Sequence, residues 1–491
     1  MAAVAAALTW LLVTHGGHNF LLGIAAVIVV GGCAWFAATS RVRLALLVIM
    51  VYLGALDGYL KLSTGSSLVT FVRDVLLWSL VVGELVRAIV NGKRLSLPPL
   101  GLWVVWFVVF VLIQLCNPQD GSLLHSFAGI RQHLEFVPLF FLTYAYVRST
   151  QALRVFVVAL TLLAVANGVV NLVQFRETPQ QLASWGPGYA ERVLGGGQFQ
   201  YAGRAFYDTS GHTHTRPFGL MSDAGSGGLV DAFALGGIVA LAYMGRRRGG
   251  SLALIAAGAI IVTAGLVSSQ GRAAVICGVV VVLTYGALSA TARGRWATLA
   301  GISGLALVAY LATGDVLNGA QSRYAGVNAS QIVQTTQTAR GYSIKEIPKT
   351  LAHHPFGAGL GVGGPAEGQS GAPALAGVAD AETEYSFLTL EAGIPGMVVL
   401  VGFTATLIGI GLWRCRREPD PEARVLLAAI IAPIGGIFVL YWASALTATT
   451  PAGPYLWSAG GIVAYWLVKR PAELRDAMRA NSGEALLVGA R

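Results

Sequence analysis

The sequence predicts an all-α polytopic membrane protein with about 12–14 transmembrane helices and one large extracytoplasmic loop. Hydrophobic residues make up 55% of the 491 residues and charged residues only 11%, whereas soluble domains carry about 25% charged residues. The mean hydropathy is +0.66. The apolar segments do not alternate as the strands of a transmembrane barrel do, which favours helices.

Apolar segments of about 20 residues, or ~17 at the short end, are long enough to cross a bilayer. The first segment is short and lacks the basic start of a signal peptide, so we treat it as a retained span. The predicted spans lie near residues 2–15, 19–39, 42–59, 67–90, 98–115, 132–147, 152–174, 218–244, 251–268, 273–292, 296–313, 396–413, 424–446 and 453–469.

Basic clusters predict the orientation of the chain. They occupy every second connection between spans, as the positive-inside rule requires, and this places both termini in the cytoplasm. The high pI of about 9.6 therefore reflects topology and does not indicate nucleic-acid binding. The clusters are Arg41/Arg43, Lys93/Arg94, Arg148/Arg154, Arg246–Arg248, Arg293/Arg295, Arg414/Arg416/Arg417 and Lys469/Arg470.

Two of the outer connections are long, and the larger one far exceeds an ordinary loop. The long connections indicate that the protein acts at the outer face. We expect N-terminal transmembrane helices (1–175), an extracytoplasmic loop (176–215), central transmembrane helices (216–313), a large extracytoplasmic catalytic loop (314–395), C-terminal transmembrane helices (396–470) and a cytoplasmic tail (471–491).

The large loop has internal order. Residues 329–351 carry apolar positions at helical spacing, which predicts one or two amphipathic helices. Residues 353–377 are rich in glycine and alanine, a composition typical of a flexible lid. The glycines in this stretch follow no predicted strand, so they do not form a dinucleotide-binding fingerprint.

Three arginines lie on the outer side, at the mouths of spans or on the large loop. They are Arg216 in THTRPFGLMSDAG, Arg272 in SSQGRAAV and Arg340 in TARGYSIKEIP. Each alone could anchor the protein at lipid headgroups. Arginine also presents a planar donor fork suited to phosphate, and a diphosphate needs several such donors at once. Together the three arginines predict a diphosphate-binding site.

The stretch DAETEYSFLTLEAGIPG places Asp380, Glu382 and Glu384 directly before an apolar span. Acids in a first helical turn interact favourably with the helix dipole, and Asp380 is a candidate N-cap. A carboxylate can also act as a general base, best when burial raises its pKa toward neutrality. Glu391 lies in the middle of the predicted helix, where it needs a partner or a water-filled pocket.

Other patterns exclude several kinds of site. The four cysteines have no paired spacing, so neither a disulfide framework nor a zinc site is expected. No histidine pair has carboxylates at metal-ligand spacing, and the lack of a Walker loop argues against an ATP-driven pump. We expect Arg73/Asp74 and Arg131/Glu135, near outer helix ends, to form local or interhelical ion pairs.

Four segments resemble motifs of the bacterial O-antigen ligase and polymerase superfamily, the Wzy-type membrane glycosyltransferases. SSQGRAAVICGVVVVL resembles the family's SR-G-A span start, and RPFGLMSDAGSGG resembles its R-x-x-G-x-x-x-x-P-N motif. RGYSIKEIPKTLAHHPFGAGLGVG resembles the arginine-bearing loop helix that precedes P-x-x-G-x-G. ETEYSFLTLEAGIPG is similar to H-N-x-x-L-x-x-L-x-E-x-G-x-x-G. The segments cover roughly residues 210–400.

The resemblance implies a GT-C-like glycosyltransferase of the bacterial inner membrane that acts in exopolysaccharide or O-antigen biosynthesis. Its donor is an undecaprenyl-diphosphate-linked oligosaccharide and its acceptor a glycan or lipid-linked glycan. Membrane lipids and chain-length regulator or export proteins are further implied partners. Arg216, Arg272 and Arg340 hold the diphosphate in this scheme, which needs neither a metal nor a cofactor.

The candidate catalytic residues are Glu382, Glu384 and His354. Ligases of the family place a histidine where this chain has Glu382, so the resemblance favours a polymerase over a ligase. Glu382 is the first candidate for the general base, and Glu384 belongs to the same acidic stretch. His354, or its neighbour His353, is the reserve base on the loop.

The alternative function is a lipid-linked glycan flippase or another multi-span transporter, because arginines in a membrane cavity suit a flippase equally well. A transporter is expected to carry polar residues near the bilayer midplane in several spans. Here most spans have apolar interiors, and the polar residues gather at one face. This distribution favours the enzyme.

The predicted topology can be tested with reporter fusions. A reporter that is active only outside the cytoplasm should be active when fused near Gly363 and inactive when fused near Gly249, which follows a basic cluster. Activity of a cytoplasm-only reporter at Gly363 would contradict an outer active site.

Overall fold

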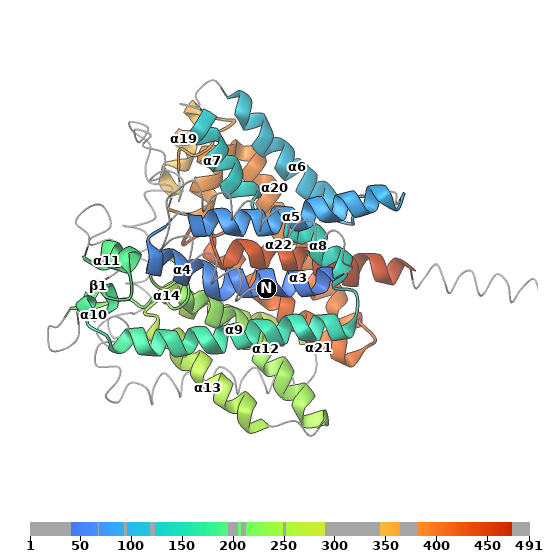
Figure 1. The fold of residues 1–491 in the computed structure, drawn as a ribbon. Helices are drawn as coiled ribbons and strands as arrows, with labels where there is room; N and C mark the ends of the chain where they lie inside the picture. The colour runs from blue at the N-terminus through green and yellow to red at the C-terminus, as the bar shows by residue number, and fades with distance from the viewer. Residues whose placement is uncertain are drawn as a thin grey trace, which may run out of the picture.

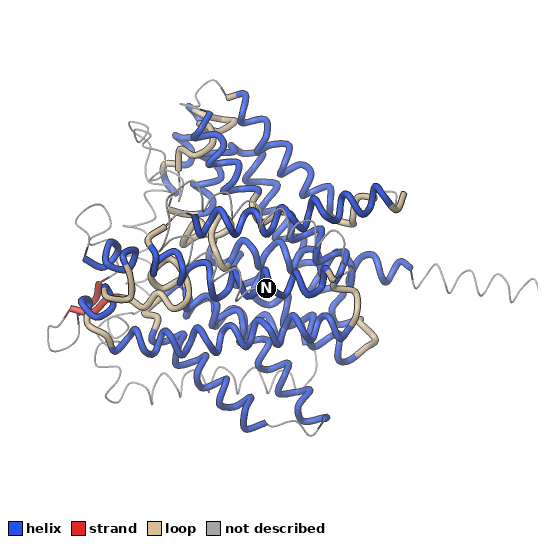
Figure 2. The backbone as a smooth tube through the Cα atoms, in the orientation of Figure 1, coloured by secondary structure: helices blue, strands red, loops and turns tan. Residues whose placement is uncertain are grey.

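A computed structural model describes residues 41–66, 68–92, 96–117, 123–194, 205–207, 213–248, 252–289, 344–363 and 382–473. These residues are helical apart from their connections and one short β-ribbon (Figures 1 and 2). Among them, six helices are long and apolar enough to cross a membrane. The protein is therefore an α-helical polytopic membrane protein, as predicted. The six spans are Val42–Thr64, Thr150–Arg176, Gly227–Gly245, Arg272–Ser289, Glu384–Arg417 and Pro421–Leu440.

The elements keep the labels of Figure 1. They are α3 (Val42–Val51), η1 (Tyr52–Leu56), α4 (Asp57–Thr64), α5 (Leu68–Val90), α6 (Gly101–Ile113), η2 (Gln114–Cys116), α7 (Leu123–Leu134), α8 (Pro138–Tyr146), α9 (Thr150–Arg176), α10 (Pro179–Ala183), α11 (Pro187–Leu194), β1 (Ala205–Tyr207), β2 (Thr213–Thr215), α12 (Gly227–Arg248), α13 (Leu252–Ser268), α14 (Arg272–Ser289), α19 (Ile347–His353), α20 (Glu384–Arg414), η4 (Cys415–Arg417), α21 (Pro421–Leu440), α22 (Ala452–Val463) and η5 (Ala464–Lys469).

Helices α12, α21 and α22 form the centre of the bundle. The most apolar stretches of α12 and α21 are 78% and 83% buried, and every residue of α22 is buried. Helix α14 packs along α21, α13 along α9, α8 against α22, and α6 beside α20. The helices α4, α10 and α11 and the β-ribbon lie together at one end (left in Figure 1). We call this end the outer end, following the predicted orientation.

Several predicted spans differ from the observed helices. The segment 132–147 is broken into α7 and α8, because Pro138 has no N–H to donate to the carbonyl of Leu134. The segment 218–244 becomes helical only at Gly227, after a turn-rich segment, 216–226. The predicted spans 2–15, 19–39 and 296–313 lie outside the described residues.

The outer connection between α9 and α12 contains structure that was not predicted. Two short helices, α10 and α11, follow α9, and β1 pairs antiparallel with β2, with Ala205 opposite Thr215. Helix α10 begins with a capping box, in which Thr178 and Gln181 exchange side-chain and backbone hydrogen bonds.

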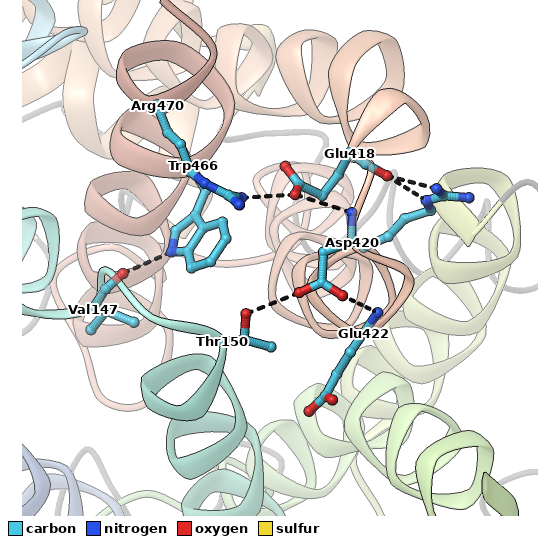
Figure 3. A network of polar contacts seen from close by, with 8 residues as sticks. Val147, Thr150, Glu418, Asp420, Glu422, Trp466 and Arg470 are labelled. Carbon is cyan, nitrogen blue, oxygen red and sulfur yellow. Dashed lines mark hydrogen bonds and ion pairs between the residues drawn. The ribbon is translucent and has the colours of Figure 1, made fainter. Parts of the chain in front are cut away.

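A polar network fastens the helix ends at the opposite end of the bundle (Figure 3). Asp420 caps α21 by accepting from the backbone N–H of Glu422 at 3.0 Å and also accepts from the Thr150 hydroxyl, at the start of α9, at 3.0 Å. Arg470 pairs with Glu418 at 2.7 Å. Among the described residues, Arg154, Arg414 and Arg470 of the predicted cytoplasmic basic clusters lie at this end.

Helix α9 has two opposite faces. Leu162 and Val169 are 63% and 45% exposed on one side, as expected for lipid-facing positions. Asn167, Asn171 and Gln174 are fully buried on another side, at spacings of four and three residues that align them along one face. Buried amides are costly unless they are hydrogen-bonded, so this face must have polar partners.

The partners of the α9 amides are the segment 216–226 and α12. The Gln174 side chain accepts from the N–H groups of Phe218 and Gly219 at 2.8 and 2.9 Å. Asn167 accepts from the N–H of Leu220 at 2.9 Å and donates to Asp231 at 2.9 Å. These amides therefore provide the hydrogen bonds that the non-helical backbone lacks.

Asp231 is fully buried on α12 and completes this network. Its two carboxylate oxygens accept from the side chains of Asn167 and Asn171 at 2.9 and 3.0 Å. The network thereby joins α9, α12 and the segment 216–226 in one buried polar contact.

Substitution of Gly219 tests how tightly this network is packed. It has a φ of +62°, and a Cβ there would clash with the Asn167 side-chain oxygen. Gly92 has a similar φ of +59° but no atom within 4 Å of such a Cβ. Gly219→Ala and Gly92→Ala share the cost of a left-handed backbone, about 1–2 kcal/mol. Gly219→Ala should lose about 1–3 kcal/mol more through overpacking, measured as thermal unfolding of the purified protein. Equal unfolding midpoints of the two variants would contradict the tight packing.

Candidate functional site

Two of the three predicted arginines lie beside the same loop segment. The Arg216 guanidinium lies directly against Gly225, which has a φ of +85° and no room for a Cβ. The carbonyl of Gly225 in turn approaches Gly271, where a Cβ would be 3.1 Å away. Arg272 follows as the exposed first residue of α14. Because a helix N-terminus carries partial positive charge, this position favours anions. Arg340 lies outside the described residues.

The acidic stretch forms the start of α20. Thr383 is the N-cap, and its hydroxyl accepts from the N–H of Ser386 at 3.1 Å. In turn, the Ser386 side-chain oxygen accepts from the N–H of Thr383. The expectation that Asp380 caps this helix is therefore wrong, because the hydroxyl of Thr383 fills that role. Glu382 is exposed, one residue before the cap.

Glu384 has a different environment, although it is only two residues away. It is fully buried, and its carboxylate accepts from the N–H groups of Leu446 and Thr447 at 2.5 and 3.1 Å and from the Thr447 hydroxyl. These bonds tie the start of α20 to the connection between α21 and α22. The observed contacts of Glu384 are structural.

Glu391 has the partner that its position in a helix requires. His133 of α7 lies 2.7 Å from the Glu391 carboxylate, and the side chains are 1% and 0% exposed. The other carboxylate oxygen accepts from the N–H of Gly363 at 2.9 Å. The His133 ring stacks on Phe387 with centroids 5.1 Å apart. Glu391 thus links α7, α20 and the large loop.

The loop contacts α20 where this helix is kinked. Pro395 cannot donate to the carbonyl of Glu391, and Gly393 leaves the helical conformation with φ +66° and ψ −170°. The N–H of Ala358 donates to the carbonyl of Leu390 at 2.6 Å. At Gly393 a Cβ would lie 2.5 Å from the carbonyl carbon of Phe356, so glycine is needed for this close approach.

The described part of the glycine-rich segment, 354–363, is packed and not open. Residues 357–361 are buried, and Asn117, after α6, donates to the carbonyl of Gly357 at 3.0 Å. The predicted lid therefore has a fixed base here; residues 364–381 lie outside the described residues. His354 is partly buried at the end of α19, and His353 is exposed, with Nδ1 2.8 Å from the Lys349 carbonyl.

The charges predicted to form ion pairs make one cluster, with partners that differ in part from the prediction. The predicted Arg73–Asp74 pair is present at 3.5 Å, whereas Arg131 pairs with Asp74 and Glu135 with Arg73. Arg73 of α5 pairs with Asp57 of α4 at 2.9 Å and with Glu135 at 2.5 Å. Arg131 of α7 pairs with Asp74 at 2.6 Å. We call these five residues the ion cluster. It joins α4, α5 and α7 near the outer end (Figure 1).

An apolar cavity of about 70 Å³ lies deeper in the bundle. Its walls include Ile49, Leu53, Phe156, Phe233 and Tyr455, from α3, η1, α9, α12 and α22. No acid, arginine, lysine or histidine lines it, so it lacks groups for proton transfer or phosphate binding. In the part of the chain that the structure describes, no group of three or more His, Cys, Asp or Glu side chains could hold a metal ion.

The outer end therefore presents two groups of candidate residues, with the ion cluster as a third feature of this end. Arg216 lies against Gly225, which approaches Gly271 directly before Arg272. Glu382 precedes α20, and His354 begins the loop segment that meets this helix at its kink. Sequence reasoning missed His133, because its partner lies 258 residues away and no local pattern signals the pair.

The fold defines a class: a polytopic α-helical membrane protein. Comparison with protein-family models, with curated proteins and with solved structures gives no match.

The His133–Glu391 pair should show non-additive energetics. Removing one partner of a buried pair typically costs about 3–5 kcal/mol, because the other is left uncompensated. His133→Phe and Glu391→Leu should each lower the unfolding midpoint strongly, and the double variant should lose less than the sum. Glu191→Leu, at an exposed position on α11, is the control. Strictly additive losses would contradict direct coupling.

Proposed function

We propose that the protein is a membrane glycosyltransferase that polymerises or ligates undecaprenyl-diphosphate-linked oligosaccharide at the outer face of the bacterial inner membrane. The observation that carries the proposal is the contact of the Arg216 guanidinium with Gly225, whose carbonyl approaches Gly271 directly before Arg272, the first residue of α14. Two guanidinium groups near a helix N-terminus suit a diphosphate. The motif resemblance supports the same substrate class.

In the proposed reaction the acceptor hydroxyl attacks the anomeric carbon of the donor sugar. Glu382 takes the hydroxyl proton as the new carbon–oxygen bond forms. The bond from the anomeric carbon to the diphosphate oxygen breaks, and its electron pair leaves with the lipid diphosphate. Arg216, Arg272 and Arg340 stabilise the charge that develops on this oxygen.

The exposure of Glu382 and the burial of Glu384 support giving the base role to Glu382. A general base must reach the proton that it removes, and the Glu384 carboxylate is surrounded by three donors of its own chain. His354 remains the reserve base, because it is partly buried beside the loop that meets α20. A carboxylate in place of the family histidine favours a polymerase over a ligase.

The transporter alternative requires polar residues at membrane depth. Asn167, Asn171 and Asp231 are such residues, but they bond to one another and to the segment 216–226. Side chains that bond to one another in this way support a structural role, so we favour the enzyme.

The arginine site can be tested by substitution. Arg216→Ala, Arg272→Ala and Arg340→Ala should each reduce transfer about 10²–10³-fold, because each removes a donor to developing charge. Lysine should rescue poorly, since it keeps the charge but loses the planar fork. Arg41→Ala, exposed at the opposite end, is the control. Near-normal glycan elongation by two of the three alanine variants would show that these arginines only anchor the protein.

The base assignment has its own test. Glu382→Gln keeps the shape of the side chain but cannot accept a proton, so elongation should fall about 10²–10⁴-fold with donor binding little changed. Asp380→Asn is the matched control. Should Glu382→Gln elongate like the wild type while His354→Asn does not, the base lies on the loop.

A further inference from the structure

The start of α20 marks the outer boundary of the membrane. The backbone N–H of Glu384, its first residue, donates to the carbonyl of Tyr441 at 3.0 Å, so this start lies level with the end of α21. Helix α21 has 20 residues, which span about 30 Å, the thickness of the hydrocarbon region. Trp442, directly after Tyr441, is 53% exposed, and tryptophan is typical of the membrane boundary.

The segment 354–363 meets α20 well below this boundary. The kink at Gly393 lies nine residues after Glu384, a distance of up to about 13 Å along the helix. At this kink the backbone of Phe356 lies against Gly393, and the N–H of Ala358 donates to the carbonyl of Leu390. The segment therefore reaches into the outer half of the span.

The backbone of the segment is equipped for this depth. Non-helical backbone within a bilayer is tolerated where protein groups surround it and satisfy it. Gln114 and Asn117, at the end of α6, donate to the carbonyls of Phe356 and Gly357. The N–H of Gly363 donates to Glu391, and residues 357–361 are buried. These contacts shield the segment as a bilayer requires.

The Phe356 side chain is the exception to this burial. It is 72% exposed, although its backbone is held between α6 and α20. Exposed apolar side chains lie on both of these helices at the same place: Ile113, directly before Gln114, is 56% exposed, and Ile394, directly after Gly393, is 42% exposed. Phe356 thus continues the apolar surfaces of two helices that face lipid.

The other end of this connection is polar. Lys349 of α19 is 58% exposed and lies 3.2 Å from Glu346. A charged pair of this kind belongs in water, because charged side chains are costly in hydrocarbon. The chain therefore passes from water at α19 to the bilayer at Phe356, and returns to α20 through buried glycines.

We propose that residues 354–363 form a re-entrant loop in the outer leaflet, in which the Phe356 side chain contacts the hydrocarbon chains of the lipids. His354, two residues earlier, then lies at the edge of the bilayer. Insertion of the loop does not depend on the transfer reaction. The further consequence, that a lipid-linked donor approaches His354 from the membrane plane, rests on the proposed function.

Spin labels test the depth of Phe356. In a chain whose four native cysteines are replaced, Phe356→Cys, Ile113→Cys and Lys349→Cys are labelled separately and compared in nanodiscs at matched unfolding midpoints. Oxygen concentrates in hydrocarbon, whereas a nickel chelate stays in water. The labels at 356 and 113 should collide more often with oxygen than with the chelate, and the label at 349 should show the reverse order.

Two results of this measurement would overturn the proposal. A label at 356 that follows the label at 349 would place the loop in water above the bilayer. A label at 356 that neither reagent reaches would place Phe356 under another protein surface, such as a second copy of the chain.

A photocrosslinker tests the same contact in a chain that keeps its cysteines. Benzoylphenylalanine in place of Phe356 should form adducts with the acyl chains of nanodisc phospholipids on irradiation, detected by mass spectrometry. The same group in place of Ile113 is the positive control, and in place of Lys349 it should give no lipid adduct. Adducts at 113 without adducts at 356 would contradict the re-entrant loop, whether or not the protein transfers glycan.

Discussion

Two buried amides of α9, Asn167 and Gln174, hold the outer loop on which the proposed site depends. A loop buried within a helical bundle has no sheet or helix to satisfy its backbone, and each unpaired group would cost free energy. Gln174 and Asn167 supply these bonds to Phe218, Gly219 and Leu220. The rigid segment then presents Arg216 beside Gly225. The position of the arginine is therefore a consequence of packing on α9.

Around α20, protein groups likewise satisfy backbone groups that lack partners, here those of a broken helix. Pro395 and Gly393 free backbone groups in α20, and the loop at 354–363 binds there. Glu391 secures the junction by accepting from Gly363 while it pairs with His133. Helix breaks in membrane proteins are tolerated where protein groups re-satisfy the backbone. Here the break fixes the loop against α20, the helix that Glu382 directly precedes.

Much of the fold follows from hydropathy alone. The spans that became α13 and α14 are uninterrupted apolar segments, and such segments predict helices without knowledge of their neighbours. The sequence also predicted that Glu391 needs a partner and that the charges near Arg73 form ion pairs. It could not name the partners, because they come from helices far apart in the chain.

The errors have physical causes of the same kind. Residues 218–226 are apolar enough to continue a span, but Gly219 and the amides of α9 favour a turn there. Asp380 was an equally good local candidate for the N-cap, and Thr383 is the cap because Ser386 completes a capping box. Glu384 resembled a site residue by position, yet tertiary contacts with Leu446 and Thr447 bury it. The local sequence pattern does not distinguish a turn from a helix, one N-cap from another, or a buried acid from an exposed one.

The central claim is that the outer end transfers glycan from a lipid diphosphate. The most direct measurement incubates the purified protein with undecaprenyl-diphosphate-linked repeat units and resolves the products by chain length. The proposed function predicts a ladder of longer chains together with released undecaprenyl diphosphate. Repeat units that stay unchanged in this assay, but cross the bilayer when the protein is placed in liposomes, would contradict the claim and identify a flippase.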